Sequence, residues 1–501
     1  MVASFVFQVR PRLGNRYFGI DTWRHLAVAE HYRRRRRGEA QDFDRYLIPE
    51  RSDYPPLLRI LLSWIPKAVL DSSQWFLSPV IDAVHSGVLF CVAYQLTGDF
   101  GAAMVAQVAY ALAPLIVMEN SNLSTRSLAS LMFTLLMISY LAFHSSGAWA
   151  LGLVSVAVGT MLFLTHRMAL QALLAITVAL SLWFQTPYYM LVFVGSWLMA
   201  IVVSGGFYWR VFTGHLAMLW WWRRNIHNRY AHQFRGLPDK AERSGDPVFR
   251  IYQIVRSAPF IAVFAGNAFV VFPIFAAIDR GFGIGLLGPS TWDLQLSFVL
   301  VWALTLLITG VLIRQIRHVE WLGEGERYGE YAAFPTALAV AASLTMVQPN
   351  LTWLPWLVFG VIAIFCGFLP ALYLQQRVVA KDKSRSLTPE LREVLEAVDT
   401  INPSPNLITF PLFLADFALY FTKARVFSTD SSFGHMHHYQ GIWPVLDSPL
   451  AEILREYDVD HVLVNESYVG RDEIGIEGAP IRAQAGSFCL VDVRAVDEGD
   501  A

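Results

Sequence analysis

Charged residues and cysteine are both scarce in this chain of 501 residues, and each scarcity excludes a class of protein. Lys, Arg, Asp and Glu make up 16% of the chain, whereas soluble domains carry about 25% charged residues. The three cysteines, Cys91, Cys366 and Cys489, lie far apart, which excludes a disulfide framework and a Cys/His metal centre. The net charge of −1 gives no basis for a nucleic-acid partner. With 55% hydrophobic residues and a mean hydropathy of +0.41, the composition indicates a membrane protein.

Long apolar runs recur along the chain at intervals that fit helices crossing a membrane. A spanning helix needs about 20 residues. The first run, MVASFVFQV, is too short, and we interpret it as an incomplete first helix in preference to a packed stub. With it, the count is about eleven transmembrane helices. The other runs are 77–97, 101–119, 126–143, 147–164, 168–184, 187–208, 252–278, 292–313, 331–347 and 351–373.

The linkers between the runs alternate between long polar segments and tiny turns. Counting the runs alternately places the long segments 10–76 and 205–250 on one face, together with the C-terminal tail. Within the first of them, residues 54–70 are too interrupted for a span. They are expected to form a helix at the membrane interface, anchored by Trp64 and Lys67. We expect a binding or catalytic surface on this elaborated face.

The last part of the chain is soluble in composition, and strand-like segments alternate with helical ones. This alternation predicts a small α/β domain with a largely parallel sheet. No glycine-rich phosphate loop follows its strands, which argues against a nucleotide site. We therefore expect a transmembrane domain over 1–378 and a soluble domain over 379–501. The expected strands are 406–410, 425–430, 460–466 and 487–493, and the expected helices are 387–401, 411–423 and 448–458.

Three stretches resemble the GT-C-type integral membrane glycosyltransferases, which include oligosaccharyltransferase catalytic subunits, protein O-mannosyltransferases and aminoarabinose transferases. GIDTWRHLAVAEHY (19–32) followed by RSDYPPLLRIL (51–61) is similar to their first external loop. ALAPLIVMENSNLSTRSLASLMFTLLMISYL (111–141) is similar to their third and fourth spans, and THRMALQALL (165–174) to the next external turn. The resemblance implies a polytopic helical fold with a soluble C-terminal domain. It also implies transfer of a sugar from a polyprenyl-phosphate carrier to a glycan, lipid or protein acceptor.

The sequence departs from the superfamily pattern in two respects. Oligosaccharyltransferase subunits carry further acids as metal ligands after an Arg-Ser pair, whereas this chain has Ala129-Ser130-Leu131 there. Their tryptophan-rich peptide-recognition motif is also absent from the soluble domain. Peptide N-glycosylation and obligate metal dependence are therefore not expected, and no metal ligand is assigned. A divalent cofactor, Mg²⁺ or Mn²⁺, stays open.

Three acids on the elaborated face are candidates for catalysis: Asp21, Asp53 and Glu119. Sugar transfer needs a group that takes a proton from the acceptor hydroxyl, and a carboxylate can do so. The resemblance gives this role to Asp21, the acid near the outer end of the first helix. The alternatives are plain structural roles. Asp21 can start a helix or pair with Arg24, Asp53 can cap a turn before Tyr54, and Glu119 can be solvated at a span end.

Cations and aromatic residues on the same face are candidates for binding the donor phosphate and the acceptor. A leaving phosphate needs its charge held by Arg, Lys or His. The alternatives are snorkelling to lipid headgroups, anchoring of the 205–250 loop on anionic lipid, and histidine pairing with the backbone. The arginine run 33–37 is expected to be solvated or in contact with headgroups. The candidates are Trp23, His25, Arg126, His166, Arg167, Arg223, Arg224, His437 and His438.

Two indicators of sidedness disagree. Cytoplasmic loops are normally richer in Lys and Arg, and the elaborated face holds nearly all of these residues, whereas the superfamily places this face outside. We follow the superfamily, because long loops obey the charge rule poorly. We expect a multi-pass protein of the plasma (inner) membrane with its long loops on the periplasmic or extracellular side. A transporter or flippase of a lipid-linked or anionic substrate, and a non-catalytic membrane scaffold, stay open as alternatives.

Overall fold

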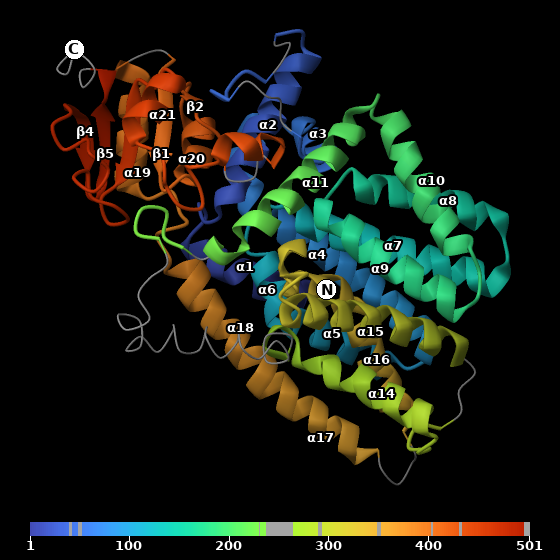
Figure 1. Cartoon of the computed structure of the whole chain (residues 1–501). Helices are drawn as coiled ribbons and strands as arrows, with labels where there is room; N and C mark the ends of the chain where they lie inside the picture. Colours follow the sequence, from blue (N-terminus) through green and yellow to red (C-terminus); the bar gives the residue numbers. More distant parts are fainter. Residues whose placement is uncertain are drawn as a thin grey trace. The chain divides into compact units, whose positions relative to one another are not determined.

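The computed structural model describes residues 1–39, 43–48, 53–229, 231–236, 264–288, 293–347, 352–401, 404–429 and 433–494. The chain forms two compact units that alternate along the sequence (Figure 1). Unit 1 comprises residues 1–16, 75–208 and 247–381, and unit 2 comprises residues 17–74, 209–246 and 382–501. The chain leaves unit 1 for the last time after Lys381. The predicted division into a transmembrane domain over 1–378 and a soluble domain over 379–501 stays a prediction.

Unit 1 is built from packed helices. Among the described residues, four helices are long and apolar enough to cross a membrane, or five if the bent pair Tyr188–Val203 and Phe207–Asn228 counts as one. The chain is therefore a multi-pass membrane protein, and the count of about eleven spans stays a prediction. The helices are α1 (Val2–Gly14), α4 (Lys67–Thr97, which begins in unit 2), α5 (Phe100–Leu112), α6 (Pro114–Glu119), α7 (Thr125–Ser146), α8 (Trp149–Phe163), α9 (Arg167–Trp183), α10 (Tyr188–Val203), α14 (Val271–Phe282), α15 (Asp293–Gln315), α16 (Glu326–Met346), and α17 (Trp353–Val361), which continues through α18 (Leu369–Leu374) to Ala380.

Prolines divide two segments that the sequence predicted as single helices. The run 101–119 is split into α5 and α6, because Ala113 is extended ahead of Pro114. The expected interfacial helix 54–70 is also two helices, since α3 (Leu57–Ser63) ends before Pro66 and α4 begins at Lys67. The first part of the predicted span 252–278 lies outside the described residues.

Helix α16 forms the centre of unit 1. Nearly every residue from Tyr328 to Met346 is buried, and α16 packs against α5, α7, α14 and α15. Its many alanines allow neighbouring backbones to approach closely. At the start of α16 the approach is extreme, because a side chain at Gly310 of α15 would lie 2.5 Å from the Gly325 carbonyl oxygen. The acids and tyrosines of its first turns are thereby held in fixed positions.

A hydrogen-bonded polar network lies inside unit 1, in a span that the sequence suggested was apolar. The Asp82 carboxylate of α4 accepts hydrogen bonds from Tyr110 Oη of α5 at 2.8 Å and from Gln8 Nε2 of α1 at 2.5 Å. The Tyr110 hydroxyl also lies 2.9 Å from His85 Nδ1, and His85 Nε2 lies 2.8 Å from Thr134 Oγ1 of α7. All five side chains are buried. Since a polar group in hydrocarbon is costly unless it is paired, this network fixes how α1, α4, α5 and α7 pack.

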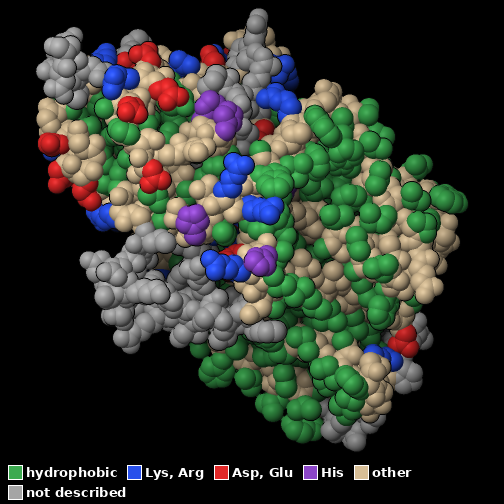
Figure 2. All heavy atoms as spheres, viewed as in Figure 1, with side chains coloured by type: hydrophobic (Ala, Val, Ile, Leu, Met, Phe, Trp, Pro, Cys, Tyr) green, Lys and Arg blue, Asp and Glu red, His purple; other side chains and the backbone are tan. Residues whose placement is uncertain are grey.

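Unit 2 contains a five-stranded sheet in the order β2-β1-β3-β5-β4. Strands β1, β2 and β3 are parallel, whereas β5 pairs antiparallel with β3 and β4. The sequence predicted four of these strands and missed β4, because this partly exposed edge strand has few apolar residues. On the face shown in Figure 2, hydrophobic side chains cover the helices of unit 1, while charged side chains gather over the strands of unit 2. The strands are β1 (Asn406–Phe410), β2 (Arg425–Val426), β3 (His461–Asn465), β4 (Ile481–Ala485) and β5 (Phe488–Asp492).

The helices of unit 2 begin and end near the predicted positions. The Thr388-Pro389-Glu390 signal is confirmed, since Thr388 Oγ1 accepts a hydrogen bond from the Leu391 N–H at 3.2 Å. Helix α19 packs on β4 and β5, and α20 packs on β1 and β2. The helices are α2 (Ile20–Arg36), α3 (Leu57–Ser63), α11 (Phe207–Asn225, which begins in unit 1), α19 (Pro389–Ile401), α20 (Leu414–Phe421) and α21 (Leu450–Glu456).

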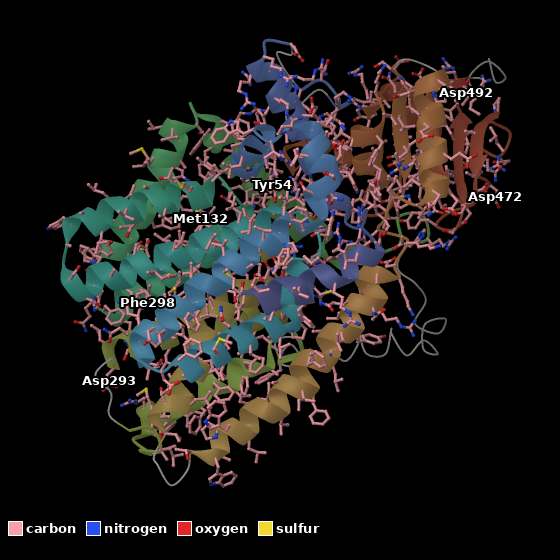
Figure 3. The ribbon with its side chains drawn as sticks, turned by 180° about the vertical axis from the view of Figure 1, so that it is seen from behind. Tyr54, Met132, Asp293, Phe298, Asp472 and Asp492 are labelled. Atoms are coloured by element: carbon pink, nitrogen blue, oxygen red, sulfur yellow. The ribbon has the colours of Figure 1, made fainter. Side chains whose placement is uncertain are left out.

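The stability of unit 2 is expected to fall in acid because of Asp492 at the end of β5 (Figure 3). Hydrogen bonds from Arg494, at 3.0 Å, and Arg482, at 2.7 Å, hold the pKa of this buried carboxyl well below its ordinary value. An unfolded Asp takes up a proton near pH 3.9 while the folded one stays ionised. The ionised Asp492 carboxylate therefore contributes its full stabilisation above about pH 5, and this stabilisation is lost as the pH falls through the pKa of the folded state.

We expect Asp492→Asn to lower the unfolding temperature of the whole protein at pH 7, and the difference from wild type to shrink towards pH 3. Thermal unfolding across this range checks the prediction. Asp472→Asn is the control, because Asp472 is exposed in the same unit (Figure 3). A difference that stays constant with pH would contradict the role of the ionised Asp492 carboxylate.

Candidate functional site

Asp21 lies in the first turn of α2, in unit 2. The start of this helix is fixed because the Gly19 N–H donates to the Arg385 carbonyl at 2.9 Å and Phe18 pairs with Ser386. Gly19 has a φ of 101°, which favours glycine there. An acid in the first turn is stabilised by the helix dipole. Asp21 Oδ1 also lies 3.2 Å from Arg24 Nη2, yet 43% of the Asp21 side chain is exposed. The carboxylate is thus oriented but open to a reactant.

A cationic and aromatic cluster surrounds Tyr54, whose place Figure 3 marks, in the same unit. The guanidinium carbons of Arg24 and Arg59 lie 5.6 and 4.6 Å from the centre of the Tyr54 ring. Arg59 Nε donates to His25 Nδ1 at 3.2 Å, which identifies this nitrogen of His25 as an acceptor. Burial, reinforced by the nearby Arg24 charge, lowers the pKa of Arg59 to about 10, so it stays charged at neutral pH. His25 is 1% exposed, and its role in substrate binding stays a prediction.

Trp23 lies on the side of α2 that packs against α20. Its side chain is 1% exposed and contacts the rings of Tyr17, Phe417, Tyr420 and Phe421. In this conformation Trp23 presents almost no surface to a ligand. Its contribution is to hold α2 against α20, and contact with substrate stays a prediction.

Asp53 is buried against helix α11. A side chain at Gly214 would place its Cβ 1.9 Å from Asp53 Oδ2, so only glycine leaves room for this carboxylate. Asp53 itself is 4% exposed. The sequence gave no signal for this pairing, because the two residues are more than 150 positions apart and only the tertiary structure brings them together.

We expect Gly214→Ala to turn the Asp53 carboxylate out of its position while leaving the protein folded. Alanine favours a helix by about 1 kcal/mol over glycine, and the carboxylate is a side-chain end that can rotate away. If Asp53 acts in the reaction, sugar transfer should fall at least ten-fold with an unfolding temperature near wild type. Thr213→Ala, at an exposed position of the same helix, is the control. Full transfer activity in Gly214→Ala would show that the Asp53 position is unimportant.

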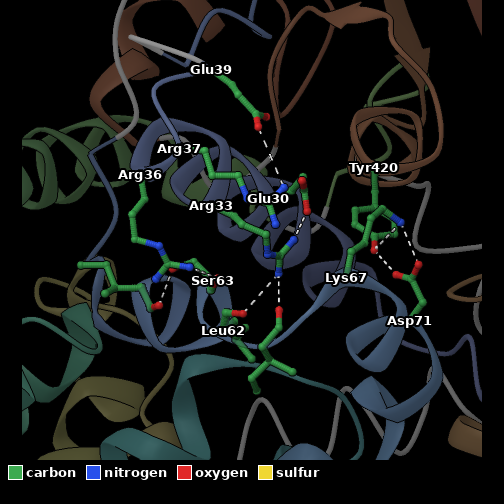
Figure 4. A network of polar contacts seen from close by, with 12 residues as sticks. Glu30, Arg33, Arg36, Arg37, Glu39, Leu62, Ser63, Lys67, Asp71 and Tyr420 are labelled. Atoms are coloured by element: carbon green, nitrogen blue, oxygen red, sulfur yellow. Dashed lines mark hydrogen bonds and ion pairs between the residues drawn. The ribbon is translucent and has the colours of Figure 1, made fainter.

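Arg33 of the run 33–37 is buried at a helix end, which differs from the solvated or headgroup-contacting role that the sequence predicted, whereas Arg34 to Arg37 are exposed (Figure 4). Arg33 is buried and donates to the Ile65 carbonyl at 2.5 Å, and Arg36 donates to the Ser63 carbonyl at 3.0 Å. These carbonyls end helix α3, where unpaired acceptors favour cations. The sequence could not reveal this, since the run and the helix end are about 30 residues apart.

The predicted basic loop begins as helix α11, and its arginines face outward. Arg223 and Arg224 are exposed, and the Arg223 guanidinium lies 5.0 Å from the centre of the Trp220 ring. On another side of the helix, Trp221 stacks on Trp443 with centroids 5.0 Å apart. The aromatic residues thus fix α11 within unit 2. The two exposed cations stay predicted contacts for a phosphate or a lipid headgroup.

The rings of His437 and His438 contact each other in unit 2, with centroids 3.9 Å apart and planes tilted by 40°. His437 is exposed, whereas His438 is half-buried and its Nδ1 lies 3.2 Å from the Tyr457 hydroxyl. His438 therefore has a structural partner, and His437 is the more accessible of the two. Contact of either with a substrate stays a prediction.

Glu119 and Arg126 form a buried charge cluster in unit 1 together with Glu330. Arg126 Nη1 is paired with Glu119 and lies 3.6 Å from Glu330 Oε1. Glu330, at the start of α16, is 2% exposed. Two carboxylates thus neutralise Arg126, and an added phosphate would have to displace one of them. Phosphate binding by Arg126 and catalysis by Glu119 stay predictions.

His166 and Arg167 lie at the start of helix α9 in unit 1, and each is 6% exposed. His166 Nδ1 is 3.0 Å from the hydroxyl of Tyr331, which follows Glu330 in α16. The helix N-terminus adds a partial positive charge at this point. An anion reaching this position would therefore meet a cation and a helix end, which is consistent with the predicted role in phosphate binding.

Two solved structures share the fold of nearly the whole chain. One is ArnT from Cupriavidus metallidurans bound to undecaprenyl phosphate, with a TM-score of 0.55 and 13% identity over 98% of this chain and 96% of that chain. The other is the oligosaccharyltransferase of Archaeoglobus fulgidus tethered to an acceptor peptide, with a TM-score of 0.52 and 13% identity over 92% of this chain and 68% of that one. The chain has a GT-C-type fold. No protein-family profile and no curated sequence matches it.

The GT-C fold raises the question of a metal, and the described acids do not fit one. Glu119 and Glu330 both face the Arg126 guanidinium, which already supplies the positive charge between them. Among the residues that the structure describes, no three His, Cys, Asp or Glu side chains are grouped to hold a metal ion.

Within the GT-C fold, sequence reasoning missed three charged residues that contact the predicted ones. Arg59 binds His25, Glu330 pairs with Arg126, and Asp416 of α20 lies 3.9 Å from Arg24. Arg59 and Glu330 lie in or beside stretches that were interpreted as apolar. Asp416 lies in a helix interpreted as part of a separate domain. The sequence signal that could have identified such residues is an ionisable side chain within or beside an apolar segment. Such a side chain has either a function or a buried partner.

Proposed function

We propose that this protein is an integral membrane glycosyltransferase that moves a sugar from a polyprenyl-phosphate carrier to a glycan, lipid or protein acceptor. The observation that carries the proposal is the GT-C fold over 98% of the chain, shared with an ArnT structure that holds undecaprenyl phosphate. The resemblance of residues 19–32 and 51–61 to the first external loop of GT-C enzymes supports it. Asp21 lies in that loop as a half-exposed carboxylate.

The reaction exchanges one bond to the anomeric carbon for another. The acceptor hydroxyl oxygen attacks the anomeric carbon, and the bond from that carbon to the phosphate oxygen breaks. The hydroxyl proton passes to the Asp21 carboxylate, and the bonding electrons leave with the polyprenyl phosphate. A general base in such a step contributes about 10²–10⁴-fold to the rate.

The departing phosphate gains one negative charge, so cations that hold it in the transition state accelerate the step. We assign this role to Arg223 and Arg224 of unit 2, the unit that also carries Asp21. Both arginines are exposed, which makes their guanidinium groups accessible to a phosphate. Arginine suits it because its planar group can donate two parallel hydrogen bonds to phosphate.

The proposal is tested with the purified protein in lipid nanodiscs supplied with sugars linked to undecaprenyl phosphate and with a crude cell-envelope acceptor fraction. Release of free undecaprenyl phosphate is the readout, because it does not require the acceptor to be known. Release that depends on both the protein and the acceptor fraction is the expected result. Movement of the intact donor across the bilayer of sealed proteoliposomes, without release, would instead indicate a flippase.

A further inference from the structure

Asp416 is a buried carboxylate on the helix that packs against α2. It lies in α20 and has no exposed surface. Phe417 and Tyr420 of the same helix contact the Trp23 ring of α2. A carboxylate in such a position is strongly unfavourable unless a cation or several donors compensate it. Asp416 Oδ2 lies 3.9 Å from Arg24 Nη1, which provides that cation.

Arg24 thus faces a carboxylate on each side. Its Nη2 lies 3.2 Å from Asp21 Oδ1, and its Nη1 faces Asp416. The two carboxylates differ in exposure, since 43% of the Asp21 side chain is accessible while Asp416 and Arg24 are buried. The geometry therefore links an accessible carboxylate to a buried one through a single planar guanidinium.

The Arg24 charge has two opposite effects on a base at Asp21. The ion pair orients the carboxylate, but an unshared cation also stabilises the ionised form and makes it a weaker proton acceptor. A second carboxylate on the same guanidinium takes up part of that positive charge. The guanidinium is oriented by a hydrogen bond to Asp21 at one end and by the charge of Asp416, 3.9 Å away, at the other.

We propose that Asp416 is a positioning residue for Asp21, acting through Arg24, which keeps Asp21 oriented yet able to accept a proton. This inference rests on the proposed transferase function. Without Asp416, less of the Arg24 charge is offset on the side away from Asp21, and one of the contacts that orient the guanidinium is lost. The reacting carboxylate then becomes a weaker base in a less defined position.

The test compares Asp416→Asn with wild type in the transfer assay across pH 4–9. We expect kcat to fall about ten-fold with KM unchanged, and the acid limb of the pH profile to move about one unit lower, the low end of the effect of a neighbouring arginine on a carboxylate. Asp416→Glu, which keeps the charge, should restore most of the rate and the position of the limb. Arg24→Lys should shift the acid limb as Asp416→Asn does, because a lysine cannot bridge two carboxylates. This variant replaces Asp416→Asn in the test if Asp416→Asn does not fold.

Asp399→Asn is the matched control, because Asp399 accepts a hydrogen bond from the Lys423 N–H at 2.7 Å in the same unit. Its loss should lower stability without moving the acid limb. Hydrogen exchange of residues 20–24 gives a readout independent of activity, and Asp416→Asn should increase it while Asp399→Asn should not. A wild-type limb in Asp416→Asn, or unchanged exchange at 20–24, would overturn the inference. Full transfer by Asp21→Asn would instead overturn the proposed function, and the exchange result would then decide the structural link alone.

Discussion

Asp21→Asn is expected to lose at least 100-fold of the transfer rate while folding like the wild type. The asparagine has the same size but cannot take the acceptor proton, and a general base contributes about 10²–10⁴-fold. Stability should change little, because the lost ion pair with Arg24 is 43% exposed on the Asp21 side and such pairs contribute about 0–1 kcal/mol. Release of undecaprenyl phosphate and thermal unfolding measure the two quantities separately.

The helix that carries Asp21 also offers its control. Glu30 and Arg33 form an ion pair with the same i, i+3 spacing in α2 as Asp21 and Arg24. Glu30→Gln removes that pair and should leave transfer within about two-fold of wild type, as expected for a partly exposed structural pair. A transferase that tolerates Asp21→Asn as well as it tolerates Glu30→Gln has its base elsewhere, and Asp53 and Glu119 are then the next residues to replace.

Arg126→Met is expected to destabilise the protein by about 3 kcal/mol, because it removes the cation paired with Glu119 and leaves the buried Glu330 with Arg327 as a nearby cation. Arg126 pairs with Glu119 and lies 3.6 Å from Glu330, and these two acids are 12% and 2% exposed. Methionine keeps much of the apolar volume, so the loss reports the charge. Thermal unfolding in detergent measures it, with retained protein after heating as a second readout.

A second substitution separates charge from packing. Arg126→Met combined with Glu330→Gln removes one uncompensated carboxylate and should recover a large part of the lost stability. Arg235→Met is the control, because Arg235 pairs with Glu473 on the exposed surface of unit 2, where solvent screens the pair and its contribution to stability is small. An Arg126→Met protein as stable as wild type would contradict the buried charge cluster. It would instead favour a solvated Arg126 that is accessible to a phosphate.

The sequence determined the elements and the chemistry of this protein more fully than it determined their partners. Apolar runs located the helices of unit 1, and alternation located β1, β3 and β5, because helix and strand periodicity are properties of neighbouring residues. The sequence analysis missed the edge strand β4 and the helix breaks at Pro114 and Pro66. The resemblance of residues 19–32 to GT-C enzymes led to Asp21, and the comparison with solved structures shows the same fold.

Only the tertiary structure decided which charges meet. Arg24 with Asp416, Arg126 with Glu330, Asp53 with Gly214 and Asp82 with Gln8 are all separated by 70 or more residues along the chain. A sequence shows where an ionisable residue lies in an apolar segment but not what compensates it. Compensation depends on the distances between side chains, which only the packing sets. The interaction between two charges weakens with distance and strengthens when both are buried. The same packing makes Arg33 the cap of a helix end rather than a solvated cation.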